Sequence, residues 1–176
     1  FEIIDKLKPS WRNELEIADA LQMLIEKEKE LTYEMITDFW KDTGTPKDII
    51  EANKKILENM KEYRKGVIED GVIISGKVMI GKDTIIKKGV KIIGPVIIGE
   101  NCIIEENSEI KENTSIGNSC KIRETVISNS IIMSDCAFEG GFMIKNSIIG
   151  SNSKILQNIS NSNNEFLLGE GSQISI

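Results

Sequence analysis

An isoleucine recurs at every sixth position from residue 74 to residue 122, without a miss. A second period of eighteen residues lies on top of the first, because an Ile-Gly pair returns at residues 80, 98 and 116. Repeats of this length are typical of a parallel β-helix, in which each coil stacks on the next and buries its apolar side chains against it. The sequence therefore predicts a β-helix whose axis is filled by Ile74, Ile80, Ile86, Ile92, Ile98, Ile104, Ile110, Ile116 and Ile122.

The composition of the chain changes near Gly66. Both Trp, both Tyr and the long Lys/Glu runs precede this point, whereas short repeats of Ile, Gly, Asn and Ser follow it. We therefore predict two segments, residues 1–65 and 66–176, with the β-helix in the second. The chain opens with Phe1 rather than Met, inside a pattern of helical spacing, and we expect it to be a fragment.

The charge balance argues against two classes of partner. The chain has 22 Lys and Arg against 28 Asp and Glu, a net charge of −6. An acidic protein repels nucleic acid and anionic membrane surfaces, so neither is expected as a partner. No apolar run approaches the roughly 20 residues that cross a bilayer, and no signal-peptide pattern opens the chain, which predicts a cytoplasmic protein. The flat-sided β-helix, with further apolar residues such as Val72, Val78, Val90 and Val96 expected on its surface, also predicts a homo-oligomer, a dimer or a trimer.

The chain contains three cysteines and no histidine. The missing histidine removes the commonest general base and metal ligand. An odd number of cysteines without metal-ligand spacing suits a reducing compartment. Cys102 and Cys120 lie one predicted coil apart, within the range that a disulfide can bridge. Buried thiols that stack as small apolar residues are the alternative that we favour.

Two further elements are expected before residue 40. Apolar residues at helical spacing predict an amphipathic helix over residues 14–29. Alternating residues with high strand propensity predict a β-strand over residues 31–37.

A second helix is expected to begin at Thr45. Thr45 is a suitable N-cap, Pro46 fits the first turn, and Asp48 completes a pair that resembles a capping box. The helix should continue to about Arg64, and its apolar face should consist of Ile49, Ala52, Ile56 and Met60.

The hexad pattern breaks after Ile122. We expect an inserted loop within residues 127–149, where Gly140 and Gly141 separate two aromatic residues, Phe138 and Phe142. The polar stretch 158–164 predicts a connector between repeats.

Trp40 and Asp42 are the candidate site residues, and they precede a Thr-Gly-Thr turn. One interpretation is a core tryptophan beside a helix-capping loop. The other is that Asp42 projects into a cleft and binds a divalent cation while Trp40 packs on the face of a sugar. One carboxylate does not hold Mg²⁺ tightly, since such sites add a second carboxylate and substrate phosphates. No Gly-rich phosphate loop occurs in the chain.

Several motifs resemble one enzyme family. The stretch Lys8-Pro9-Ser10-Trp11-Arg12-Asn13-Glu14, together with Trp40-Lys41-Asp42-Thr43-Gly44-Thr45 and Glu51-Ala52-Asn53, resembles the second half of the nucleotidyltransferase domain in long-form glucose-1-phosphate thymidylyltransferases. The tail from Phe166 to Ile174 is similar to the closing Leu-Gly-Asp-x-Ser motif of that family. The resemblance implies an α+β remnant of a Rossmann-like nucleotidyltransferase domain followed by a left-handed parallel β-helix of hexapeptide repeats.

The resemblance also implies a reaction. The family transfers a thymidylyl group from dTTP, a nucleoside triphosphate, to glucose 1-phosphate with Mg²⁺ and releases pyrophosphate. Asp42 would be one of two metal-binding aspartates, Trp40 would line the sugar pocket, and residues 14–19 would form the floor beneath it. The family's Gly-rich loop, first metal aspartate and Glu-Lys-Pro sugar motif have no counterpart here. The catalytic residues are therefore expected outside this chain, which alone should be inactive and serve assembly.

Two other functions stay open at this point. Left-handed hexapeptide helices often transfer acetyl groups from coenzyme A, commonly with a His base that this chain lacks. Lys87, Lys88 and Lys91 could meet an acidic cofactor, although such a run usually forms a solvated face. The third interpretation is a structural module for oligomerisation and rigidity.

Overall fold

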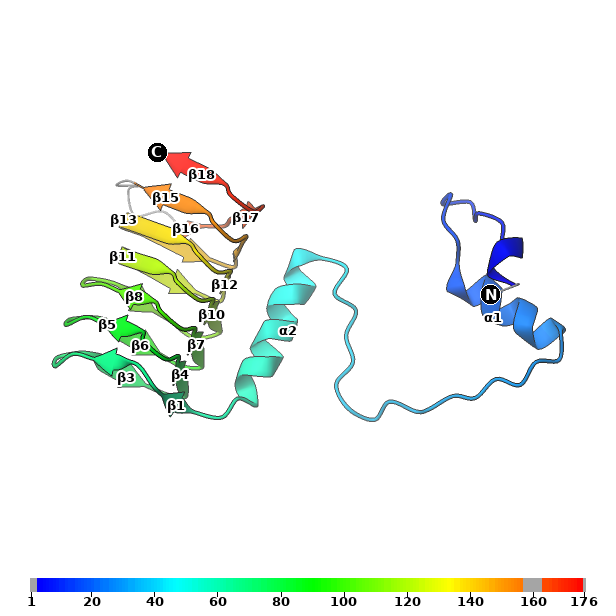
Figure 1. Ribbon diagram of the computed structural model, residues 1–176, viewed down its shortest axis with the longest axis horizontal. Helices are drawn as coiled ribbons and strands as arrows, with labels where there is room; N and C mark the ends of the chain where they lie inside the picture. Colours follow the sequence, from blue (N-terminus) through cyan, green and yellow to red (C-terminus); the bar gives the residue numbers. More distant parts are fainter. Residues whose placement is uncertain (1–2, 157–162, 176) are drawn as a thin grey trace. The chain divides into compact units, whose positions relative to one another are not determined.

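The computed structural model describes residues 3–156 and 163–175, which fall into two compact units, Phe1–Trp40 and Lys41–Ile176 (Figure 1). The first unit contains a 3₁₀ helix, η1 (Ile4–Lys6), and one α-helix, α1 (Ile17–Glu26). The second unit contains helix α2 (Pro46–Glu58) and all the strands. The predicted connector at residues 158–164 lies mostly outside the described residues.

Two predictions differ from the structure of the first unit, the bounds of its helix and the strand at residues 31–37. Helix α1 is shorter than expected, because Glu16 is still extended and the chain leaves the helix at Lys27. The predicted strand at residues 31–37 is wrong, since those residues form no regular element. Alternation provides the propensity for a strand, but a strand also needs a neighbour with which to pair, and this unit offers none among its described residues.

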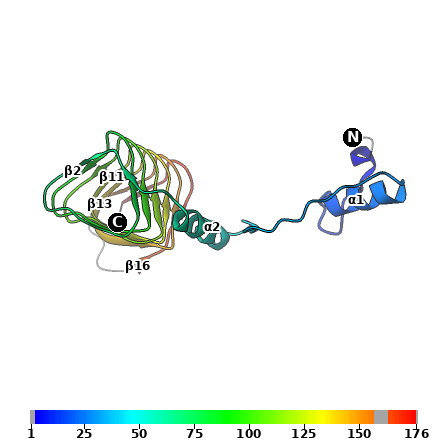
Figure 2. The same cartoon turned by 90° about the horizontal axis from the view of Figure 1, so that it is seen from below.

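The second unit is a parallel β-solenoid of stacked coils. Seen along the stack in Figure 2, the coils overlie one another as closed rings, with α2 against one side. Its strands are β1 (Tyr63–Arg64), β2 (Val67–Ile68), β3 (Ile73–Ser75), β4 (Val78–Ile80), β5 (Ile85–Ile86), β6 (Lys91–Ile93), β7 (Val96–Ile98), β8 (Ile103–Ile104), β9 (Glu109–Ile110), β10 (Thr114–Ile116), β11 (Lys121–Ser128), β12 (Ile131–Ile132), β13 (Ala137–Lys145), β14 (Ile148–Ile149), β15 (Lys154–Leu156), β16 (Asn163–Asn164), β17 (Leu167–Leu168) and β18 (Gln173–Ser175).

Strands of the inner coils pair in parallel with strands of the coil before and the coil after, and strands at the two ends of the stack pair on one side only. One face is the seven-stranded sheet β1-β4-β7-β10-β12-β14-β17. The second face follows β2-β5-β8-β11-β13-β15-β18, and the third begins with β3-β6-β9. The long strands β11 and β13 pass through a corner, so the second and third faces join there.

The isoleucine ladder is confirmed from Ile80 to Ile122, and Ile74, in the first coil, is half-buried against the same core. Ile80 pairs with Ile98, and Ile98 pairs with Ile116, so three of its members stack directly on one face. The ladder side chains from Ile80 to Ile122 are at most 2% exposed. Full burial of such a side chain stabilises the fold by about 1.5–3 kcal/mol relative to an exposed position. The ladder is therefore the main source of stability in this unit.

The predicted inserted loop within residues 127–149 is wrong. Ile116 pairs with Ile132, sixteen positions later, and Ile132 pairs with Ile149, seventeen positions later. The coils thus become shorter by one or two residues but stay in the solenoid. Phe138 and Phe142 both lie in β13, and they are 1% and 2% exposed.

The shortening occurs at two corners, one within β11 and one between β11 and β12. Glu124 has a φ of 51°, and the register between β11 and β13 shifts between Arg123 and Thr125. A residue removed at a corner leaves every axial side chain in place, because corner residues do not point into the axis. The six-residue spacing of the axial residues is lost at these positions, although the coils continue to stack.

The cysteines occupy one column beside a corner. Cys102, Cys120 and Cys136 are buried and free, which confirms the favoured interpretation over the disulfide. Each thiol lies near a carbonyl oxygen of the next coil, as Cys102 Sγ does at 3.1 Å from Gly117 O. The neighbouring thiols of Cys102 and Cys136, together with burial, raise the pKa of the Cys120 thiol above its usual range.

Helix α2 begins as predicted and ends early. The Asp48 amide donates to Thr45 Oγ1 at 3.3 Å, and the Thr45 amide donates to Asp48 Oδ2 at 3.2 Å, which completes the capping box. The helix ends at Glu58 rather than near Arg64, because Tyr63 and Arg64 already form β1 and pair with β4.

The apolar face predicted for α2 is wrong. Ile50 and Leu57 are the buried residues of the helix, whereas Ile56 is 66% exposed. Asn53, between the two buried residues, donates to Asn113 O at 3.2 Å and accepts from Ser115 Oγ at 2.6 Å. The helix carries two apolar stripes one residue apart. It docks on the solenoid with the stripe of Ile50 and Leu57, whereas the prediction chose the neighbouring stripe of Ile49 and Ile56.

Replacement of Leu57 by alanine tests this docking. We expect the substitution to destabilise the second unit by about 2–3 kcal/mol, because it removes most of a fully buried side chain and leaves a cavity. Amide hydrogen exchange should show faster opening of α2 than of the solenoid strands. Ile56→Ala, one residue earlier on the exposed stripe, is the matched control and should cost less than about 1 kcal/mol. Equal losses for the two variants would show that α2 is not docked through Leu57.

Candidate functional site

The two candidate site residues lie on either side of the boundary between the units. Trp40 is the last residue of the first unit and is 70% exposed. Asp42 is the second residue of the second unit and is also exposed. The prediction that Asp42 and Trp40 share one cleft therefore stays a prediction.

Lys41 ties the start of the second unit to helix α2. Its ammonium lies 3.1 Å from Asp48 Oδ1 and also pairs with Glu51. The hydrogen bond that Lys41 donates to Glu51, followed by the one that it donates to Asp48, raises the pKa of Lys41 above its usual value. Lys41 thus attaches the chain to the first turns of α2 one residue before Asp42.

The described residues do not make a complete site for Mg²⁺. Within residues 3–156 and 163–175, no group of three or more His, Cys, Asp or Glu side chains could hold a metal ion. A tight Mg²⁺ site that included the predicted ligand Asp42 would therefore need further carboxylate or phosphate ligands.

A small polar cluster orders the segment before α1. Arg12 Nη2 lies 2.7 Å from Glu16 Oε1, and the Ser10 hydroxyl donates to the same oxygen at 2.9 Å. The hydrogen bond from Arg12, and then that from Ser10, lowers the pKa of Glu16. Residues 14–19, which the resemblance places under a sugar pocket, thus have a fixed local shape.

The first unit buries little of its own apolar surface. Of the described residues in this unit, Ala20 alone is buried. Trp11 is 93% exposed, and Ile17 is 74% exposed. Isolated exposed apolar residues are normal, but a unit without a core is unusual.

Several cationic side chains on the outer surface of the solenoid pair with carboxylates in adjacent coils. Lys87 Nζ lies 2.9 Å from Glu69 Oε1, and Lys91 Nζ lies 3.6 Å from Glu109 Oε1. The side chain of Arg123 pairs with Glu139 at 2.7 Å in the same manner. This arrangement supports a solvated, internally paired face rather than a binding site for an acidic cofactor.

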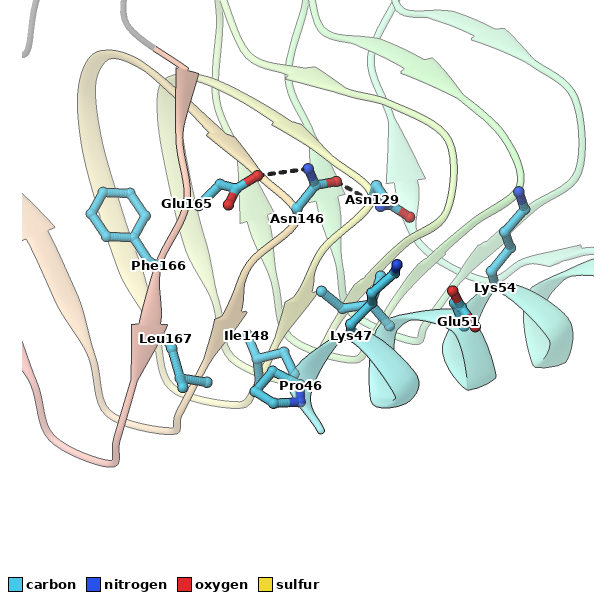
Figure 3. Close-up of a pocket in the computed structure, with 11 residues that line it drawn as sticks. Pro46, Lys47, Glu51, Lys54, Asn129, Asn146, Ile148, Glu165, Phe166 and Leu167 are labelled. Atoms are coloured by element: carbon cyan, nitrogen blue, oxygen red, sulfur yellow. Dashed lines mark hydrogen bonds between the residues drawn. The ribbon is translucent and has the colours of Figure 1, made fainter. Parts of the chain in front are cut away.

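Sequence reasoning missed a cavity of about 580 Å³ beside the N-terminal half of α2 (Figure 3). The helix and the last coils of the solenoid together form its walls. The helix side and the solenoid side are separated by about a hundred residues in the sequence, so no local motif marks the cavity. Its lining consists of Pro46, Lys47, Ile50, Glu51, Lys54, Asn129, Asn146, Ile148, Glu165, Phe166 and Leu167.

Comparison with known protein families matches both parts of the chain. Residues 1–59 match the nucleotidyl transferase family model, and residues 92–175 match the model of the GMPPB C-terminal domain. The chain is also 33% identical to a glucose-1-phosphate thymidylyltransferase from Streptomyces antibioticus over 176 residues, which is 99% of this chain. The chain belongs to the sugar nucleotidyltransferase family. In this chain the match to the nucleotidyl transferase model precedes the match to the GMPPB C-terminal domain, which covers most of the solenoid.

Two further relatives match over shorter ranges. The low-salt glycan biosynthesis nucleotidyltransferase Agl11 of Haloferax volcanii is 39% identical over 82 residues, 47% of this chain and 23% of its own length. The bifunctional protein GlmU of Methanocaldococcus jannaschii is 42% identical over 85 residues, 48% of this chain and 21% of its own length. The chain spans 49% of the Streptomyces antibioticus protein, or about half of it.

Two general properties of such enzymes concern their substrates and their metal. Nucleotidyltransferases of this kind act on a nucleoside triphosphate and a sugar 1-phosphate, and they generally use a divalent metal. In the part of the chain that the structure describes, neither α1 nor α2 has the length and hydropathy that a membrane-spanning helix requires.

Proposed function

We propose that this chain is part of a glucose-1-phosphate thymidylyltransferase, which forms dTDP-glucose and pyrophosphate from dTTP and glucose 1-phosphate with Mg²⁺. The observation that carries the proposal is the 33% identity with the Streptomyces antibioticus enzyme of that name over nearly the whole chain. Mg²⁺ in such a reaction neutralises phosphate charge as the sugar phosphate attacks. The protein is proposed to act in the cytoplasm.

Two residues of this chain are assigned roles in that reaction. The Asp42 carboxylate is proposed as one ligand of the metal, and the Trp40 ring is proposed to pack against the sugar. The exposed apolar side chains of the first unit support this view, because a complete nucleotidyltransferase domain would cover residues such as Trp11 and Ile17. The catalytic cradle for the triphosphate is assigned to residues outside this chain.

Pyrophosphate release tests this proposal. The full-length protein with glucose 1-phosphate and Mg²⁺ should release pyrophosphate faster from dTTP than from UTP, ATP or GTP. The 176-residue chain should release none under the same conditions, because positioning and charge stabilisation of the triphosphate need the remaining groups. Faster release from another nucleotide would refute the thymidylyl assignment, and release by the chain alone would refute the assignment of the cradle.

An acyltransferase activity of the solenoid is not favoured. The chain lacks the histidine that usually serves as base in that chemistry, and two of the three lysines that could meet coenzyme A, Lys87 and Lys91, are paired with carboxylates. Acetyl-coenzyme A and an amino-sugar phosphate should therefore yield no free thiol with this chain.

The solenoid is proposed to serve assembly. The valines expected on its surface are wrong for this role, because Val78, Val90 and Val96 are buried in the core. Val67 and Ile73, which are 61% and 59% exposed on the outer surface, offer contact area to a second copy instead. We expect a dimer or trimer by light scattering after gel filtration at micromolar concentration. A monodisperse species of 19.7 kDa would contradict the prediction.

A further inference from the structure

The cavity beside α2 is lined by lysines on the helix, by asparagine and glutamate side chains on the solenoid, and by apolar side chains from both. Its volume of about 580 Å³ lies within the range of about 300–1,000 Å³ that small-molecule sites occupy. Pro46 and Ile50 from the helix and Ile148 and Leu167 from the solenoid provide the apolar part. The cavity exists because α2 is anchored through Leu57 and Asn53, nearer its C-terminal end, so its N-terminal half bridges the last coils.

The helix side of the cavity is positively charged. Lys47 and Lys54 are seven residues apart, two helical turns, and both side chains extend toward the same side of the cavity in Figure 3. Neither lysine forms an ion pair within the described residues. Glu51 lies between them but is engaged by Lys41. Two cationic charges therefore remain available to an anionic group.

The solenoid side of the cavity carries acceptors. Asn129 donates from Nδ2 to Asn146 Oδ1 at 2.7 Å, and Asn146 donates from Nδ2 to Glu165 Oε1 at 2.8 Å. Among the described residues, this row, visible in Figure 3, leaves Asn129 Oδ1 and Glu165 Oε2 as acceptors at its two ends, and one N–H of each asparagine side chain as a donor. Hydroxyl groups of a ligand can donate to these acceptors and accept from these donors.

The charges and hydrogen-bonding groups on the two sides of the cavity favour one class of ligand. A simple anion would satisfy the lysines but would be repelled by Glu165, and a neutral sugar would leave both lysines without a counter-charge. A phosphate ester of a sugar supplies the anion and the hydroxyl donors in one molecule, while its C–H face can pack on Pro46 and Leu167. We propose that this cavity binds a sugar phosphate, either free or as part of a sugar nucleotide. The proposal concerns residues to which the proposed reaction assigns no role.

Calorimetric titration of the 176-residue chain tests the proposal with three probes. Glucose 1-phosphate and dTDP-glucose represent the two sources of the ligand, and inorganic phosphate represents the anion alone. We expect saturable binding of at least one sugar phosphate, with an affinity at least about tenfold above that of inorganic phosphate, because only the ester meets both sides. No saturable binding, or equal affinity for inorganic phosphate, would overturn the proposal.

Matched variants locate the binding. The pair Lys47→Ala and Lys54→Ala should weaken binding of the sugar phosphate at least about tenfold, since two charge-assisted contacts are lost. The pair Lys82→Ala and Lys88→Ala removes the same charge from exposed positions on the solenoid and should change the affinity less than about twofold. Glu165→Ala should weaken sugar-phosphate binding without weakening that of inorganic phosphate. Equal effects of the two lysine pairs would place the ligand elsewhere and overturn the assignment.

Discussion

Ile98→Asp is expected to abolish the cooperative unfolding transition of the solenoid. Ile98 is 1% exposed in β7 and stacks between Ile80 in the coil before it and Ile116 in the coil after it. The new carboxylate would lie in the dry axis without a partner, at a cost of about 4 kcal/mol or more. That loss is comparable with the whole stability of many small domains, which is about 5–15 kcal/mol.

Thermal and urea melts followed by circular dichroism measure this effect. Ile93→Asp is the matched control, because Ile93 belongs to β6 but is 39% exposed on the outer surface. The control should shift the transition only slightly. Coincident melts of the Ile98→Asp variant and the parent would contradict the axial position of Ile98.

The part of the fold that repeats was predictable from the sequence. Along the ladder, the spacing of isoleucines follows directly from the geometry of the coil, because every sixth side chain points to the axis. The spacing failed after Ile122, where β11 passes a corner with Glu124 at positive φ. A missing corner residue changes the spacing between axial residues but leaves their side chains buried. Phe138 was therefore expected in a loop, although it lies in the core.

The elements outside the repeat were less predictable, for a different reason. Helix α2 has apolar residues on two adjacent stripes, and only the docked structure decides between Ile50 and Ile56. The strand expected at residues 31–37 depended on a neighbour that its own sequence cannot supply. The cavity joins Lys47 to Glu165 through the docking of α2, and periodicity carries no information about such a long-range contact.

Asp42→Ala in the full-length protein should lower kcat/KM for dTDP-glucose formation at least about a hundredfold. A metal ligand acts on charge that develops in the transition state, so its loss affects turnover more than substrate binding. Asp38→Ala, an exposed aspartate four residues earlier, is the control and should keep near-parental turnover. Near-parental turnover of the Asp42→Ala variant would return Asp42 to the alternative of an ordinary aspartate before a helix cap.

Titration of Mn²⁺ into the full-length protein with bound dTTP, followed by electron paramagnetic resonance, examines Asp42 without relying on turnover. Mn²⁺ is the probe because it takes the carboxylate and phosphate ligands that Mg²⁺ takes. Asp42→Ala should weaken the affinity for Mn²⁺ at least about tenfold, while Asp38→Ala should leave it unchanged. Equal Mn²⁺ affinity in the parent and the Asp42→Ala variant would contradict the claim that this chain supplies a metal ligand to a nucleotidyltransferase site.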